Sequence, residues 1–321
     1  MIDLSKTSSL MGWPETRKAI EAALREALGK MPKHPQDSQI KVIEENETRG
    51  ITRKRVIFSV TDDETVSGWL FSPDGKEEVP GILCCHGLTP HGKDEPAGFE
   101  GNHRLAFAQH YAERGYATLA VDMPAAGERT PAKREHFDAD FFHKENPGMS
   151  LAAKALSDHM QAVGVFAEVK RVDATRIGVI GHGLGGFNAL LLAAFDDRVQ
   201  ACVASSAFTR LATDKTPGQW PGSPPVTLVP KFSATGPGGS FPLDWEHILA
   251  LAAPTAVQVI TSLSNSIHTN PKSCQKAVTL AGKIYKLLGA QSALDLYTHH
   301  DGEDFTPETL DVADEWFERW L

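Results

Sequence analysis

The chain has 321 residues, of which 41% are hydrophobic and 23% charged, a composition typical of globular proteins. Its 41 acidic and 32 basic residues give a formal net charge of −9, which argues against a nucleic-acid-binding surface and disfavours docking on anionic membranes. Four cysteines without a CxxC pair predict neither a disulfide scaffold nor a zinc site, and no apolar stretch approaches the roughly 20 residues of a membrane span. We therefore expect a soluble, cytoplasmic protein.

The first predicted elements are one helix and several strands. Residues 14–29 carry apolar side chains at helical spacing, between a proline at the start and a glycine at the end. Residues 51–60 and 65–72 have the composition of strands, and the TDDE sequence between them predicts a turn, so the two form a hairpin. Residues 80–85 are a short apolar run of the kind found in buried parallel strands.

Predicted strands and helices alternate from about residue 80 to residue 321. Further strands are predicted at 116–122, 176–181, 199–206, 254–261 and 293–298, and helices at 103–114, 149–169, 184–195, 271–288 and 307–321. This alternation is typical of an α/β fold, a mostly parallel sheet with helices on both faces, to which the N-terminal hairpin adds antiparallel strands at one edge. No long polar linker interrupts it, so we expect a single domain, 1–321, with an N-terminal helical extension at about 1–48.

Two segments interrupt the alternation. Residues 123–148 carry prolines, glycines and charges and are expected to form a long surface loop. Residues 207–241 are rich in Pro, Gly and Thr and predict an irregular excursion from the sheet. We expect these two segments to form the wall and the lid of a pocket, and so to decide the size of its ligand.

A glycine-rich motif, GHGLGG at residues 181–186, follows one predicted strand and opens a helix. It fits the dinucleotide-binding pattern GxGxxG, but the next strand ends in ASSA (204–207), without a carboxylate to hold a ribose hydroxyl. The alternative is a nucleophile elbow, a sharp turn between strand and helix with the pattern GxSxG, flanked by small residues because the two elements approach closely. The context favours the elbow, and we expect no cofactor.

Five segments carry a family resemblance: HGLTPHGKDE (86–95), YATLAVDMPAAGER (116–129), RIGVIGHGLGGFNALL (176–191), the strand at 254–261, and GEDFTPE (302–308). With them the chain resembles the α/β-hydrolase family, and more narrowly its dienelactone hydrolase-like and acetyl-xylan-esterase-like members, over roughly residues 50–321. The resemblance implies an α/β-hydrolase fold. It also implies a site with a serine nucleophile in the elbow, an acid, a histidine, and an oxyanion hole of backbone N–H groups.

The sequence departs from the family at all three catalytic positions. The elbow nucleophile is replaced by Gly183, which has no side chain with which to form an acyl-enzyme. The acid aligns with Asn265, or one residue later with Ser266, and neither is a carboxylate. Glu303 stands where the family's GHxF pattern has its histidine. We interpret this as a degenerate triad, with Glu303 as the candidate acid or base.

Seven further residues are candidate substrate contacts, because the fold places them beside the elbow, in the oxyanion loop or on the rim of the site: His86, Gly87, Asp122, Glu128, His182, Leu184 and His300. The backbones of Gly87 and Leu184 are the expected oxyanion donors. Histidines and Glu303 do not have a spacing that requires a metal, so no metal site is predicted. Cys84 and Cys85 lie in an apolar run and are expected to be reduced core residues.

Three functions fit these residues. The first is a pseudohydrolase that binds a small carbonyl ligand without turnover. The second is an enzyme without a serine nucleophile, in which the oxyanion backbone polarises a carbonyl and Glu303 acts as acid or base. The alternative to both is an ordinary carboxylesterase or dienelactone-type hydrolase with a misaligned triad, for which Ser205 and Ser206 are the nearest serines after a central strand. Each predicts a small-molecule carbonyl ligand as partner, without nucleic acid or membrane; the oligomeric state does not follow from the sequence.

Overall fold

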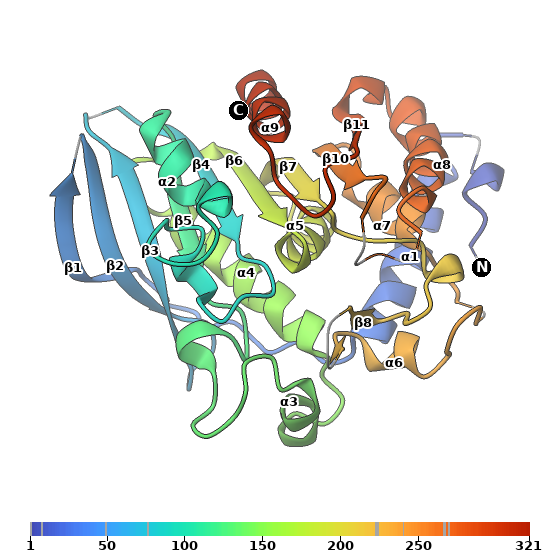
Figure 1. The fold of residues 1–321 in the computed structure, drawn as a ribbon. Coiled ribbons are helices and arrows are strands. Elements are labelled where there is room, and N and C mark those ends of the chain that lie inside the picture. Colours follow the sequence, from blue (N-terminus) through green and yellow to red (C-terminus); the bar gives the residue numbers. More distant parts are fainter. Residues whose placement is uncertain are drawn as a thin grey trace.

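The computed structural model describes residues 2–7, 9–48, 50–75, 77–221, 225–239, 241–265, 268 and 270–321. Within these residues a nine-stranded sheet runs through the molecule (Figure 1), in the order β1-β2-β3-β5-β4-β6-β7-β10-β11. Its strands are β1 (Lys41–Thr48), β2 (Ile51–Ser59), β3 (Thr65–Pro73), β4 (Val79–Cys85), β5 (Ala117–Val121), β6 (Val172–His182), β7 (Val199–Ser205), β10 (Ala256–Ser262) and β11 (Leu294–His299). A separate antiparallel pair consists of β8 (Gln219–Trp220) and β9 (Val226–Thr227).

Strand direction divides the sheet into two parts. The pairs β5–β4, β4–β6, β6–β7, β7–β10 and β10–β11 are all parallel. The pairs β1–β2, β2–β3 and β3–β5 are antiparallel and lie at the blue end of the sheet in Figure 1. The carboxyl ends of the six parallel strands therefore meet at one edge, which is where α/β sheets of this kind hold their ligands.

Helices cover both faces of the parallel part. The helices of the described residues, including α3 and α6 in the excursions outside the sheet, are α1 (Trp13–Leu28), α2 (Phe107–Glu113), α3 (Ala139–Glu145), α4 (Leu151–Ala167), α5 (Leu184–Phe195), α6 (Pro230–Ser233), α7 (Trp245–Ala252), α8 (Ser273–Leu287) and α9 (Pro307–Trp320). A Cβ atom on Gly81 of β4 would touch Phe166 of α4, whereas one on Gly178 of β6 would touch Phe317 of α9. Gly178 pairs with Ile82, the residue after Gly81, and successive strand residues face opposite sides. Helices α4 and α9 therefore pack on opposite faces.

The predicted α/β-hydrolase arrangement is confirmed, including the antiparallel hairpin of β2 and β3 and the alternation of strands and helices after β4. The predicted helix at 103–114 is a short 3₁₀ turn followed by α2. The expected loop at 123–148 contains α3, and the excursion at 207–241 contains β8, β9 and α6. Strand β1 and helix α7 were not predicted; β1 extends the sheet at its edge by pairing with β2. Within the described residues, none of the helices combines the length and apolar character that crossing a membrane requires.

Candidate active site

The turn between β6 and α5 consists of one residue. Strand β6 ends at His182 and α5 begins at Leu184, and Gly183 between them has φ 60° and ψ −125°, a conformation that favours glycine. Its N–H donates to the backbone oxygen of Ser205 on the neighbouring strand at 2.9 Å, and its carbonyl accepts from the N–H of Phe187 at 3.1 Å. The backbone of the turn is therefore fixed both to the sheet and to the first turn of α5.

Three glycines beside the turn let the helix approach the sheet. A Cβ atom would lie 2.2 Å from the Gly185 carbonyl carbon if placed on Gly181, 2.2 Å from the Cys85 oxygen if placed on Gly185, and 2.5 Å from the Ser205 oxygen if placed on Gly186. At Gly183 the nearest atom would be Cζ2 of Trp220, at an ordinary contact distance of 3.5 Å. The flanking glycines are thus required by close backbone packing, whereas position 183 has room for a side chain.

The loop after β4 lies against this turn. A Cβ atom on Gly87 would lie 3.4 Å from the backbone oxygen of His182. His86 is buried, its Nε2 accepts from the N–H of Met123 at 3.0 Å, and its Nδ1 therefore donates to the oxygen of Gly87 at 2.8 Å. Burial lowers the pKa of His86, so the ring is neutral at pH 7. Leu184 is the first residue of α5, where backbone N–H groups lack an acceptor within the helix.

His182 connects the elbow to the segment after β11. Its ring donates to the backbone carbonyl of Glu303, which raises the pKa, but burial dominates and lowers the pKa to about 4. Nδ1 then accepts from the hydroxyl of Ser205 at 2.9 Å. The ring also packs against Phe305, with centroids 5.8 Å apart. The structure therefore brings the backbone of residue 303 next to the elbow; that Glu303 stands at the family's histidine position stays a prediction.

The segment after β10 carries Asn265 and His268, and the sequence reasoning missed the second. The oxygen Oδ1 of Asn265 accepts from the N–H of His268 at 2.7 Å, and Nε2 of His268 donates to the backbone oxygen of Ser206 at 2.8 Å. The His268 ring meets Trp220 edge-on, with centroids 5.3 Å apart. Asn265 thus lies among residues near the elbow. Ser266, the alternative acid position, lies outside the described residues.

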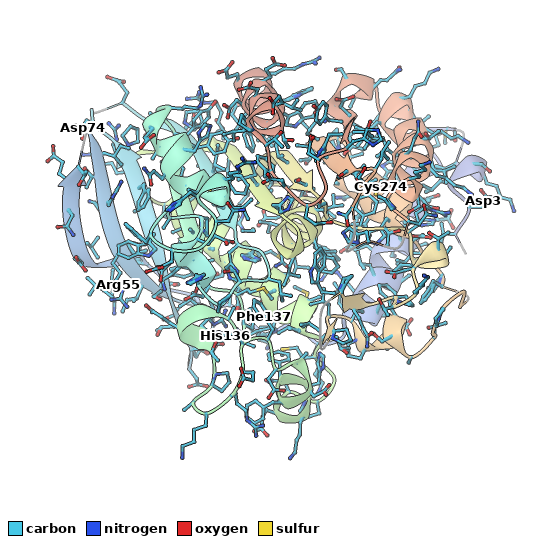
Figure 2. All side chains as sticks on the ribbon, viewed as in Figure 1. Asp3, Arg55, Asp74, His136, Phe137 and Cys274 are labelled. Atoms are coloured by element: carbon cyan, nitrogen blue, oxygen red, sulfur yellow. The ribbon has the colours of Figure 1, made fainter. Side chains whose placement is uncertain are left out.

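The predicted rim residue Asp122 is fully buried and belongs to an ion network. Its carboxylate accepts from the N–H of Lys93 at 2.7 Å, from Nζ of Lys93 at 3.0 Å, and from the N–H of Glu128 at 3.1 Å. Glu128 is half-exposed and accepts from Lys93 at 3.1 Å and, at 2.7 Å, from Arg55 of β2, a residue that Figure 2 labels. These carboxylates hold the loop after β4 to the loop after β5.

The remaining predicted positions lie apart from that network. The ring of His300, an exposed residue, lies 3.3 Å from the hydroxyl of Ser264. Cys84 and Cys85 are buried, and burial raises the pKa of both thiols. In the part of the chain that the structure describes, His, Cys, Asp and Glu side chains do not gather in threes as a metal site needs. Substrate contacts by Asp122, Glu128 and His300 stay a prediction.

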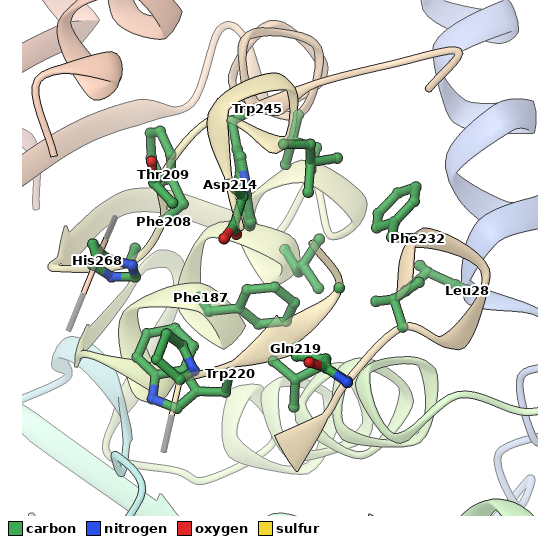
Figure 3. Close-up of a pocket in the computed structure, with 18 of the residues that line it drawn as sticks. Leu28, Phe187, Phe208, Thr209, Asp214, Gln219, Trp220, Phe232, Trp245 and His268 are labelled. Carbon is green, nitrogen blue, oxygen red and sulfur yellow. The ribbon is translucent and has the colours of Figure 1, made fainter. Parts of the chain in front are cut away.

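A pocket opens beside the elbow (Figure 3). It holds about 540 Å³ of space not filled by atoms, part of it open to solvent. Most of its wall is the segment 207–232, joined by Phe187 of α5, Trp245 of α7, Leu28 of α1 and His268. Trp220 links it to the elbow, because the same ring lies next to position 183. Segment 207–241 thus lines this pocket, whereas the described lining residues of 123–148 belong to a different pocket, around Arg129 and Phe141. The expected roles of the two segments as lid and wall stay a prediction.

Residues 80–231 match the family model described as the alpha/beta hydrolase fold. The chain is an α/β-hydrolase-fold protein. The match includes β4, β6, the elbow and α5, the elements that build the site. The predicted resemblance to this family is confirmed, and the curated relatives and solved structures that match the chain include proteins named as esterases.

Two curated relatives and one solved structure illustrate the likeness. The chain is 25% identical over 149 residues to the quorum-quenching protein AidA of Acinetobacter baumannii (strain MDR-ZJ06), covering 46% of this chain and 42% of that protein. It is 27% identical over 173 residues to the esterase FrsA of Escherichia coli O81 (strain ED1a), covering 53% of this chain and 36% of that protein. The match thus spans about two fifths of the length of these two relatives. A glucuronoyl esterase from Solibacter usitatus superposes with a TM-score of 0.75 at 17% identity, over 97% of this chain and 93% of that chain.

Proposed function

We propose that the protein hydrolyses small carboxylic esters, with a water molecule acting in place of the elbow serine. The observation that carries the proposal is Gly183. It keeps a one-residue turn at the start of α5, beside a pocket, and carries no side chain, so the attacking oxygen of the proposed reaction comes from water. The esterase-type relatives and neighbours support the choice of an ester over other carbonyl compounds.

In the proposed reaction the carbonyl oxygen of the ester accepts hydrogen bonds from backbone N–H groups at Leu184 and the Gly87 loop. Glu303 removes a proton from the water, and the water oxygen forms a bond to the carbonyl carbon. The carbon–oxygen bond to the alcohol then breaks, and the leaving oxygen takes the proton from Glu303. The products are a carboxylic acid, which ionises, and an alcohol. The position of Glu303 supports this role, because its backbone carbonyl accepts a hydrogen bond from the ring of His182, the neighbour of Gly183.

A second candidate function, ligand binding without turnover, is favoured by the missing side chain at position 183. A third candidate is an ordinary serine esterase, because the hydroxyl of Ser205 lies 2.9 Å from the His182 ring, as in a serine–histidine pair. Ser205, however, is 1% exposed at the end of a regular strand, so a substrate carbonyl has little access to its hydroxyl. The ester assay below separates these cases.

The test is turnover of p-nitrophenyl acetate, p-nitrophenyl butyrate and small lactones by the wild type and by E303Q, D304N and S205A. We expect wild-type hydrolysis, with a pH–rate profile set by one carboxylate. We further expect a loss of about 10²–10⁴-fold in kcat for E303Q but not for the neighbouring control D304N. A loss in S205A instead would assign the reaction to that serine. If the wild type is inactive and only G183S/N265D/E303H turns over, the protein is a binder and the proposal is wrong.

A further inference from the structure

The pocket beside the elbow has aromatic walls. Phe208 and Trp245 stack with centroids 4.7 Å apart and planes at 16°, and Phe187 meets Trp245 edge-on at 5.4 Å. Trp220 closes the side nearest the elbow, 6.5 Å from Phe187. Aromatic walls of this kind accept an apolar group because the rings are hydrophobic, and they accept a cation because the ring faces carry negative partial charge. A second feature is needed to decide between the two.

That feature is Asp214, whose carboxylate Figure 3 shows turned toward the space between the rings. The N–H of Thr216 donates to its Oδ1 at 2.9 Å and holds the side chain in place. Burial raises the pKa of Asp214 and outweighs the hydrogen bonds from Thr216 and Lys215, which lower it, so burial disfavours the ionised form. A positively charged ligand would offset this cost, whereas an apolar ligand would increase it.

The other polar groups of the wall do not supply that positive charge. Among the described residues that line the pocket, Asp214 alone carries a formal charge at neutral pH. His268 is the other titratable group there, and burial lowers its pKa, so the ring is neutral at pH 7. Thr209 and Gln219 are uncharged. The net charge of −9 also favours the approach of cations over anions.

We infer that this pocket recognises a small organic cation, an alkylammonium or quaternary ammonium group, held between the aromatic rings and the Asp214 carboxylate. The inference deepens the proposed function and rests on it for turnover: Trp220 adjoins both the pocket and position 183, so the substrate is an ester that carries a cationic head group. Cation binding itself requires no turnover and is tested separately.

The test compares two probes of the same shape. Choline carries a trimethylammonium group, and 3,3-dimethylbutan-1-ol has a neutral tert-butyl group in its place. Calorimetric titration at pH 7.5 and low salt is expected to show choline binding at least about tenfold more tightly, the scale of a desolvated cation–π contact combined with an ion pair. D214N retains the acceptor for the Thr216 N–H but removes the charge, and is expected to abolish the preference. D311N, at an exposed site on α9, changes the net charge equally and is expected to preserve it.

Each outcome decides the inference. Equal binding of the two probes, binding of neither, or a preference that survives in D214N overturns it; equal binding would assign the pocket to an apolar group. Hydrolysis of acetylcholine and of 3,3-dimethylbutyl acetate is measured in parallel. If choline binds preferentially and neither ester is hydrolysed, the cation site stands and the proposed hydrolysis fails. If the two esters are hydrolysed equally and choline shows no preference, hydrolysis stands and the cation site fails.

Discussion

The buried pair of Lys93 and Asp122 allows a quantitative test of what holds the loop after β4. Lys93 is 1% exposed and Asp122 is 0% exposed, and the two carboxylate oxygens of Asp122 accept from Nζ and from two backbone N–H groups. Removing one member leaves the other as a buried charge, which costs about 3–5 kcal/mol. K93M should therefore lower the free energy of unfolding by about that amount. The cost of D122N should lie near the lower end of this range, because Glu128 stays 3.1 Å from the Lys93 ammonium group.

The double variant K93M/D122N tests the reasoning behind these magnitudes. It leaves no buried charge and loses one acceptor for a backbone N–H, worth about 1–3 kcal/mol. Its cost should therefore be smaller than the sum of the single costs, with a coupling energy of at least about 2 kcal/mol. Equilibrium unfolding in urea, followed by the fluorescence of the six tryptophans, measures all three variants. R55M, which removes a half-exposed partner of Glu128, should cost less than about 1 kcal/mol. Single costs below 1 kcal/mol, or strictly additive ones, would refute the argument.

Two further predictions concern the elbow and the effect of pH. G181A should unfold the protein or greatly reduce its yield, since its Cβ would lie 2.2 Å from the Gly185 backbone. The control G282A places its Cβ in open space on α8 and should raise the free energy of unfolding by about 0.5–1 kcal/mol. Normal folding of G181A would show that the close approach of helix and strand does not require glycine. Burial lowers the pKa of His159 to about 3 and of His182 to about 4, so between pH 6.5 and 4 the unfolded chain binds protons that the folded chain does not. The free energy of unfolding should therefore be highest above pH 6.5 and fall as pH is lowered through that window. H159Q should reduce the slope by about one proton, and an unchanged slope across a pH series of urea midpoints would contradict this.

Much of the sheet could be predicted because its strands are buried apolar runs. Strands β4 and β5 are apolar at nearly every position, and β10, although it also carries three polar residues, is buried along its whole length, as expected for strands covered on both faces. Strand β1 was missed since all its residues are exposed, so KVIEENET shows no alternation of apolar and polar side chains. Helix α7 was missed for the opposite reason: all eight residues are buried, so no polar face marks the helical period. Apolar runs therefore predict the central strands, whereas an exposed edge strand and a helix without a polar face carry no pattern by which to find them.

Site residues in short local motifs could be predicted, whereas those placed by contacts between distant parts of the chain could not. Positions 183 and 303 could be aligned because each lies in a short motif next to a regular element. His268 and Asp214 could not be found, since each lies in an irregular segment whose contacts come from distant parts of the chain. His268 is held by the backbone of Ser206, and its partner across the pocket wall is Trp220. No periodicity in the sequence reports such contacts.

The geometry around Gly183 explains how this turn is held without a side chain at position 183. The turn is held by the Ser205 oxygen and the Phe187 N–H, and its close packing depends on Gly181, Gly185 and Gly186. None of these interactions involves a side chain at position 183. A serine there would adopt positive φ at a cost on the order of 1–3 kcal/mol, which glycine avoids. A glycine at this position therefore avoids strain without disturbing the turn or the pocket. The scaffold is compatible with water-based hydrolysis, with an ordinary serine esterase reaction at another residue and with binding alone, and the variants E303Q and S205A decide between them.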